Sequence, residues 1–146
     1  MRALLVLCTI LLTSCATQPN QASSSYGASV GIVNHTDKFI YSAAVNGAGG
    51  ANMPAWGTGM ANVCCAMVPK KWYPGMVALV EWDMPEGSKH IYKQQKVEVE
   101  QYSEPGSIYL HFYPEDKVRV IVSPYDGASP LHPIPRPKKP TSPQNK

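Results

Sequence analysis

Three groups of residues in this chain are of types that could do chemistry. Ser29 stands between small residues in Gly27-Ala28-Ser29-Val30-Gly31, two cysteines are adjacent at Cys64-Cys65, and four histidines are scattered along the chain (His35, His90, His111 and His132). The serine pattern is that of a nucleophile elbow, which requires a sharp strand-to-helix turn and a partner acid and histidine. Serine-rich residues precede Ser29 and a strand pattern follows it, so the sequence does not favour a catalytic serine there.

The histidines have no spacing typical of metal ligands, so we expect them to be structural or exposed and expect no metal ion or cofactor. A glycine cluster could indicate phosphate binding (Gly47, Gly49, Gly50, Gly57 and Gly59). It lacks the lysine and the serine or threonine of a phosphate-binding loop, and no helical pattern follows. Backbone positions with positive φ explain these glycines more simply. We therefore expect a protein that is not an enzyme and has no small-molecule substrate.

Cys64-Cys65 admits three interpretations. One thiol is buried and the other partly covered, or the two form a vicinal disulfide in an oxidising compartment, or the pair serves metal or redox chemistry. The last is disfavoured because the number of ligands is too small. Neighbouring residues of a strand point to opposite faces, so both thiols cannot enter one core. A disulfide between sequence neighbours closes too small a ring to reduce chain entropy much, so it would act by fixing a local turn.

The first fifteen residues have the three parts of a bacterial export signal. Arg2 supplies positive charge, and Ala3 to Leu12 is an almost continuous apolar run, too short to span a bilayer. Leu12-Thr13-Ser14-Cys15 then resembles the lipobox of bacterial lipoproteins, in which the cysteine is lipidated with fatty acids such as palmitate and becomes the first residue. We therefore expect residues 1–14 to be a signal peptide and Cys15 to be the lipid attachment site. An ordinary secretory signal is the alternative.

Composition and charge limit the cellular location and the class of partner that we expect. Ala16 stands where an aspartate commonly retains lipoproteins at the inner membrane of Gram-negative bacteria, which favours the outer membrane and a domain facing the periplasm. No other stretch is long and apolar enough for a transmembrane helix. Residues 26–132 hold 8 basic and 10 acidic side chains. A nucleic-acid-binding domain usually has a basic face, so we expect no nucleic acid as partner.

Polar segments flank one central domain. Residues 15–28 include a run of serines and indicate a flexible, lipidated tether. Residues 130–146 contain six prolines and an excess of basic residues, which is typical of a disordered tail. The domain is then expected over residues 29–129.

Alternating apolar and polar residues between turn signals predict strands in this domain. The segments are residues 30–33, 38–45, 76–82, 92–102, 108–113 and 117–123. Because no helical period is present, we expect an all-β fold, a two-sheet antiparallel sandwich of roughly seven strands. The glycine-rich stretch 46–72 is predicted to be a long loop with one interrupted strand over residues 62–67.

Tryptophan and tyrosine dominate the energetics of protein interfaces, so they are the candidates for partner binding. Trp82 lies in an alternating strand and is expected in the core. Trp72 and Tyr73, between Pro69 and Gly75, are predicted in a loop or strand edge and are the better candidates, together with Trp56.

The domain also resembles a family of small bacterial lipoproteins of unknown function, some of which serve as immunity proteins to phospholipase effectors of type VI secretion. The stretches that carry the resemblance are Val33-Asn34-His35-Thr36-Asp37, Val45-Asn46-Gly47-Ala48-Gly49-Gly50, Val63-Cys64-Cys65, Pro69-Lys70-Lys71-Trp72, Pro85-Glu86-Gly87-Ser88-Lys89 and Val118-Arg119-Val120. The resemblance implies a lipid-anchored, periplasm-facing domain that binds such a phospholipase and blocks it. The alternative is a structural or accessory envelope lipoprotein with no toxin partner.

Overall fold

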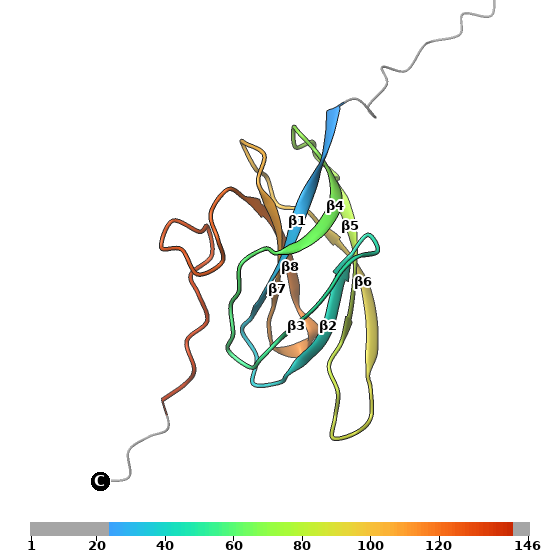
Figure 1. Cartoon of the computed structure of the whole chain (residues 1–146), viewed down its shortest axis with the longest axis vertical. Helices are drawn as coiled ribbons and strands as arrows, with labels where there is room; N and C mark the ends of the chain where they lie inside the picture. The colour runs from blue at the N-terminus through green and yellow to red at the C-terminus, as the bar shows by residue number, and fades with distance from the viewer. Residues whose placement is uncertain (1–23, 142–146) are drawn as a thin grey trace, which may run out of the picture.

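The computed structural model describes residues 24–141, which fold into two four-stranded β-sheets packed face to face (Figure 1). The described strands are β1 Ser25–Asn34, β2 Ile40–Val45, β3 Ala48–Met53, β4 Val63–Pro69, β5 Val77–Asp83, β6 Tyr92–Glu98, β7 Ser107–Phe112 and β8 Val118–Ser123, with a short 3-10 turn η2 at Pro114–Asp116. The all-β sandwich is confirmed, with eight strands in this part of the chain. The predicted signal peptide and Cys15 lie outside the described residues, and among residues 24–141 no helix is long and apolar enough to cross a membrane.

The first sheet has the order β4-β1-β7-β8 and the second the order β3-β2-β5-β6. The second sheet is antiparallel throughout. In the first sheet β1 and β7 run parallel, with Ile32 opposite Leu110, so the prediction of a purely antiparallel sandwich is wrong for this sheet. Parallel neighbours need a long crossover, and here the whole second sheet lies between β1 and β7 in the sequence.

The main core lies between the sheets and follows from the alternation of apolar residues. The fully covered inner residues include Val30 and Ile32 of β1, Val80 and Trp82 of β5, and Leu110 of β7. Trp82 is only 4% exposed, as predicted from its alternating strand.

A second, smaller core covers the outer face of the first sheet. Val33, Tyr109 and Ile121 pack there against Ile134, which comes from the segment after β8. The buried chain therefore continues past the domain end predicted at residue 129. The proline-rich composition gave no sign of this contact, because a single isoleucine supplies most of its apolar surface. Gly31 permits the arrangement, since a Cβ there would lie 2.5 Å from the Tyr109 ring.

The N-terminal boundary also differs from the prediction. Strand β1 begins at Ser25, inside the stretch 15–28 that was expected to be a tether. Ala28 is buried, and the Tyr26 hydroxyl both donates to the carbonyl of Gly106 (2.7 Å) and accepts from its N–H (2.8 Å). Pairing with β4 fixes these small and polar residues, so residues 25–28 belong to the domain and not to the predicted tether.

The glycine-rich stretch 46–72 contains two strands, β3 and β4, where one interrupted strand was predicted. Asn46 (φ 50°) and Gly47 (φ 78°) form a two-residue turn between β2 and β3. Asn-Gly with positive φ at both positions is the preferred sequence of a type I′ hairpin. Strand β3 was missed because its glycines and alanines give no alternation to detect.

The sandwich has two ends, which we name by the chain terminus (Figure 1). The N-terminal end holds the start of β1 and the loops 70–76 and 99–106; Lys70 N–H donates to the Ser24 carbonyl there. The far end holds the loops 35–39, 84–91 and 113–117. Lys38 and Glu86 pair at 3.3 Å, so the loops 35–39 and 84–91 meet at the far end.

Candidate functional site

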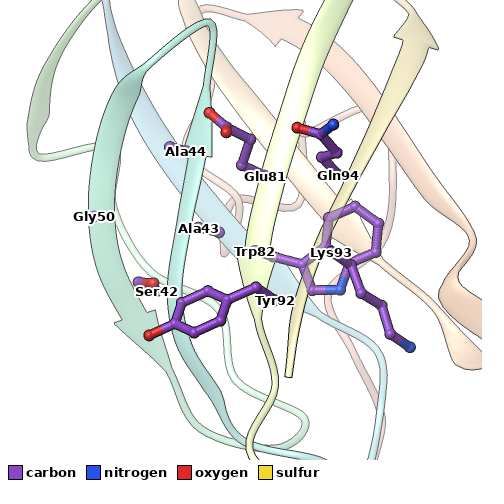
Figure 2. A pocket seen from close by; sticks show the side chains of 9 residues that line it. All are labelled: Ser42, Ala43, Ala44, Gly50, Glu81, Trp82, Tyr92, Lys93 and Gln94. Atoms are coloured by element: carbon purple, nitrogen blue, oxygen red, sulfur yellow. The ribbon is translucent and has the colours of Figure 1, made fainter. Parts of the chain in front are cut away.

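A hollow of about 440 Å³ opens on the outer face of the second sheet, between β3, β2, β5 and β6 (Figure 2). Its floor is made by small residues, Ser42 and Ala44 of β2 and Gly50 of β3. Glu81 of β5 and Gln94 of β6 stand beside the floor, because the sheet places Ala44, Glu81 and Gln94 in one row across the strands. The short side chains of β2 and β3 leave the space that the longer ones border.

Three aromatic rings stand where this hollow meets the far end, and we call them the aromatic patch: Tyr41, His90 and Tyr92. Tyr41 is 54% exposed and Tyr92 is 76% exposed. The Tyr41 and His90 rings meet edge to face with centroids 4.8 Å apart, and the His90 and Tyr92 rings stack at 5.9 Å. Large rings that remain this exposed while contacting one another form a surface suited to a protein partner.

Asp83 fixes the middle ring of the aromatic patch. Its carboxylate is buried at the end of β5, where Oδ1 accepts the N–H of Ile91 (3.0 Å) and Oδ2 pairs with Nδ1 of His90. A carboxylate accepts, so His90 donates from Nδ1. The pairing therefore holds the His90 ring in one orientation between Tyr41 and Tyr92.

The three aromatic residues proposed from the sequence do not come together. Trp72 and Tyr73 border a second hollow, also of about 440 Å³, at the N-terminal end. Trp72 packs partly against the main core and its indole N–H donates to the Val99 carbonyl (2.8 Å), whereas Tyr73 is 43% exposed. Trp56 lies in the loop between β3 and β4, partly buried, and its backbone N–H donates to the Thr36 carbonyl (3.0 Å).

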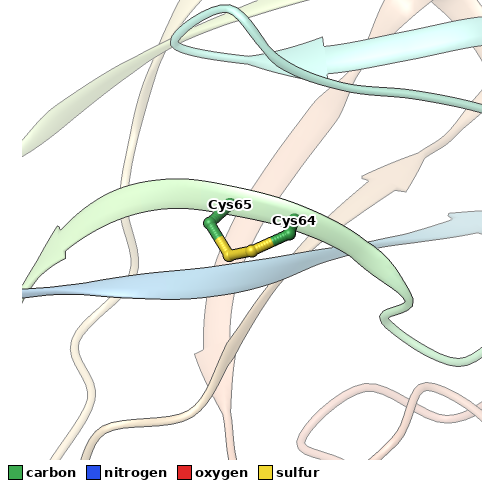
Figure 3. Close-up of a disulfide and its surroundings, with 2 residues drawn as sticks. All are labelled: Cys64 and Cys65. Atoms are coloured by element: carbon green, nitrogen blue, oxygen red, sulfur yellow. A yellow bond between two sulfur atoms is a disulfide. The ribbon is translucent and has the colours of Figure 1, made fainter.

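Cys64 and Cys65 of the edge strand β4 are joined in an exposed disulfide that lies toward the neighbouring strand β1, close to Gly27 (Figure 3). The register of β4 against β1 explains how two residues that are adjacent in the sequence lie on the same face of the sheet. Ala28 pairs with Ala66 and Val30 with Val63, so both cysteines stand opposite the single residue Ser29. Such a β-bulge interrupts the alternation of side chains. Both cysteines are exposed, and neither enters the core. Ser29 is part of a continuous strand, without the strand-to-helix turn of a nucleophile elbow.

Three of the four histidines form a hydrogen-bonded chain that the sequence did not predict. His35 Nε2 lies 3.0 Å from His111 Nδ1, and His111 Nε2 lies 3.0 Å from His132 Nε2. His132 Nδ1 lies 2.8 Å from the Tyr125 carbonyl. The first comes from the turn after β1, the second from β7 and the third from the C-terminal segment, so no sequence spacing could reveal the chain.

The Tyr125 carbonyl fixes the direction of the protons along this chain. It only accepts, so His132 carries its proton on Nδ1 and accepts on Nε2, and His111 and His35 each donate from Nε2. With all three imidazoles neutral, each ring nitrogen that faces another ring meets the donor or acceptor that it needs. Burial, followed by the nearby His132, His35 and Arg119, lowers the pKa of His111 to about 2. The pKa of His35 is also lowered, by burial and then by Arg119. His35, His111 and His132 thus connect parts of the fold by hydrogen bonds. Among residues 24–141, no group of three or more potential ligands could hold a metal ion.

Sequence reasoning missed the aromatic patch, although part of its signal was present. Tyr41 and Tyr92 stood in predicted strands, and His90 lies two residues before Tyr92. Their common location depends on the pairing of β2 with β5, which places Ser42 opposite Asp83. The local sequence does not specify that pairing.

Comparison with known proteins gives a family but no function. No curated protein and no solved structure matches the chain. Residues 33–120 match a family model described as a protein of unknown function, DUF3304, and this range runs from the end of β1 into β8. The match covers more than half of the sequence, so the chain belongs to the DUF3304 family.

Proposed function

We propose that this chain is a lipid-anchored envelope protein of the outer membrane whose domain binds a protein partner through the aromatic patch. The partner is a phospholipase effector of type VI secretion, and binding neutralises it. The observation that carries this proposal is the position of the patch, which lies toward the end of the sandwich opposite the start of β1 (Figure 1). The lipobox and the family resemblance supply the rest.

The anchor and the patch fit one orientation of the domain. Eight residues separate Cys15 from Ser24, which limits the extended tether to about 30 Å. The N-terminal end of the sandwich therefore stays near the bilayer, and the far end with the patch projects into the periplasm. A partner that works on lipid would meet the patch close to its own substrate, and tethering raises the local concentration of the inhibitor there.

The surface has the character of an interface core. Tyrosines are enriched among the residues that contribute most to binding. A tyrosine side chain has few torsions to immobilise, so its entropy cost on binding is low. The small-residue floor beside Tyr92 offers a recess for a protruding side chain of the partner. Blocking an enzyme by occupying its surface requires tight binding and no chemistry of the inhibitor's own.

The test uses the mature chain with Cys15→Ala, so that no acyl chain contributes, and the product of the neighbouring gene. Binding is measured by pull-down, and phospholipase activity is measured in the mixture. We expect stoichiometric binding and loss of lipase activity. A Tyr41→Ala/Tyr92→Ala double variant should weaken binding at least a hundredfold, the loss of about 3 kcal/mol typical of two interface tyrosines.

The matched control is Tyr125→Ala/Leu131→Ala, which removes two exposed large side chains elsewhere (41% and 65%). It should bind like the unsubstituted chain. Equal loss in both double variants would contradict the assignment of the patch. Absence of any binding, or a neighbouring gene that encodes no lipase, would contradict the immunity function and favour the structural envelope role.

A further inference from the structure

We infer that the N-terminal end of the sandwich carries a second binding surface, which takes the anionic phospholipid headgroups of the membrane that holds the anchor. This inference rests on the lipid anchor of the proposed function but not on the identity of the protein partner. The surface consists of Lys70, Lys71, Trp72 and Tyr73 around the hollow that Ser24 and Ser25 also border.

Charge is the first argument. Lys70 and Lys71 are adjacent and exposed, and neither has a carboxylate within ion-pair distance among residues 24–141. At the far end, by contrast, Lys38 pairs with Glu86 and Lys93 pairs with Asp116. The exposed carboxylates at this end, Glu98 at the end of β6 and Glu104 in the loop 99–106, lie beyond ion-pair distance of both lysines, and Glu100 pairs instead with Arg119. Lys70 and Lys71 therefore stay available to headgroups. Unpaired lysines at the end from which the chain is anchored match the charge of an anionic leaflet.

The construction of the loop is the second argument. The Trp72 indole donates to the Val99 carbonyl and packs on the core, which fixes the loop 70–76 against the sandwich. Tyr73 follows directly and is 43% exposed. A tyrosine beside lysines suits the boundary between headgroups and acyl chains, because its ring is apolar and its hydroxyl is wet. The hollow between them has a volume of about 440 Å³, within the range of sites for small molecules.

Position is the third argument. Lys70 N–H donates to the carbonyl of Ser24 at 2.6 Å, so the lysine pair is joined directly to the point where the tether enters the domain. With eight residues of tether between Cys15 and Ser24, this end is never more than about 30 Å from the bilayer surface. A weak surface attraction suffices at that range, because the anchor has already removed most of the entropy cost of association.

The experiment measures sedimentation of the mature Cys15→Ala chain with vesicles. One set contains phosphatidylglycerol and phosphatidylcholine, and the other contains phosphatidylcholine alone. We expect stronger binding to the anionic vesicles, and a loss of about thirtyfold in the partition coefficient for Lys70→Gln/Lys71→Gln, since each lysine near an anionic surface contributes roughly fivefold.

The matched control is Lys138→Gln/Lys139→Gln, an adjacent lysine pair in the basic C-terminal segment. It should keep its partition coefficient within about twofold, because that segment does not border the hollow. Equal sedimentation with both kinds of vesicle would overturn the inference, as would a loss equal in both variants or confined to the control. Pull-down of the phospholipase by Lys70→Gln/Lys71→Gln should be unchanged, so failure of this inference is distinguishable from failure of the immunity function.

Discussion

Acidification from pH 7.5 to pH 5 tests the histidine chain that joins the C-terminal segment to the sandwich. His111 is completely buried between His35 and His132 and is neutral in the folded protein. Its pKa is about 2 when folded, because burial excludes the charged form, and about 6.5 in the unfolded chain. Between these two values the unfolded state binds a proton that the folded state does not bind. Stability is therefore lost as the pH falls below about 6.5.

The size of this loss follows from the two pKa values. Each pH unit below the unfolded pKa costs about 1.4 kcal/mol for one such group. At pH 5, the free energy of unfolding should be about 2 kcal/mol lower than at pH 7.5 because of His111 alone. His35 acts in the same direction, since its pKa is also lowered on folding. Most carboxylates do not begin to titrate until the pH is below about 5, so they contribute little in this window.

Urea unfolding at both pH values, followed by tryptophan fluorescence, measures the difference. The His111→Gln variant removes the titrating group while keeping an amide that can hydrogen-bond to both neighbours. It should be less stable at pH 7.5, and its further loss at pH 5 should be smaller than that of the unsubstituted chain by about 2 kcal/mol. Lys96→Gln, an exposed substitution on β6, should retain the full pH dependence.

An equal pH dependence in the unsubstituted chain and in His111→Gln would refute this reasoning. It would mean that His111 of the folded protein also takes up a proton between pH 7.5 and pH 5. The arrangement of three neutral imidazoles, fixed by the Tyr125 carbonyl, would then be wrong. A pH-independent free energy of unfolding in the unsubstituted chain would have the same meaning.

Three further substitutions test individual contacts by urea unfolding. Ile134→Ala should cost about 2 kcal/mol, because it opens a cavity in the small outer core, and a cost near zero would mean that the C-terminal segment is not packed. Trp72→Phe removes the hydrogen bond to Val99 and leaves that carbonyl without its donor, so we expect a loss of about 1 kcal/mol; an unchanged midpoint would place the indole elsewhere. Tyr26→Phe removes both contacts of the hydroxyl with Gly106 and should cost about 1–2 kcal/mol, unless β1 begins later than Ser25.

Much of the fold was predictable because its strands obey local rules. The segment 108–113 alternates and becomes β7, and 117–123 becomes β8. Strand β7 also carried an unused signal, since large residues occupy both of its faces. Ile108 and Leu110 enter the main core, whereas Tyr109 and His111 lie on the other face and need a cover of their own. A strand that is apolar or aromatic on both faces predicts a third layer, even where the covering segment looks like a tail.

The parts that escaped prediction depend on contacts between distant residues. The parallel pairing of β1 with β7 joins Val30 to Ile108, and nothing in either strand specifies its neighbour. The bulge opposite Ser29 places two exposed cysteines on one face, which contradicts the simple alternation that local reasoning must assume. Strand β3 forms because its hairpin partner is adjacent, despite a composition with little preference for strands.

The aromatic patch and the surface around Lys70 and Lys71 differ in how far the sequence alone could predict them. The lysine pair and Trp72 are neighbours in the sequence, so a predicted loop already places them together, although only Trp72 and Tyr73 of this surface were predicted to bind a partner. The aromatic patch joins Tyr41 to His90 across 49 positions, and a shift of one residue between β2 and β5 would turn one of the rings to the other face. The register of β2 against β5 therefore decides whether the aromatic patch forms at the far end. Substitutions that alter the register should abolish the proposed partner binding even where Tyr41, His90 and Tyr92 are all retained.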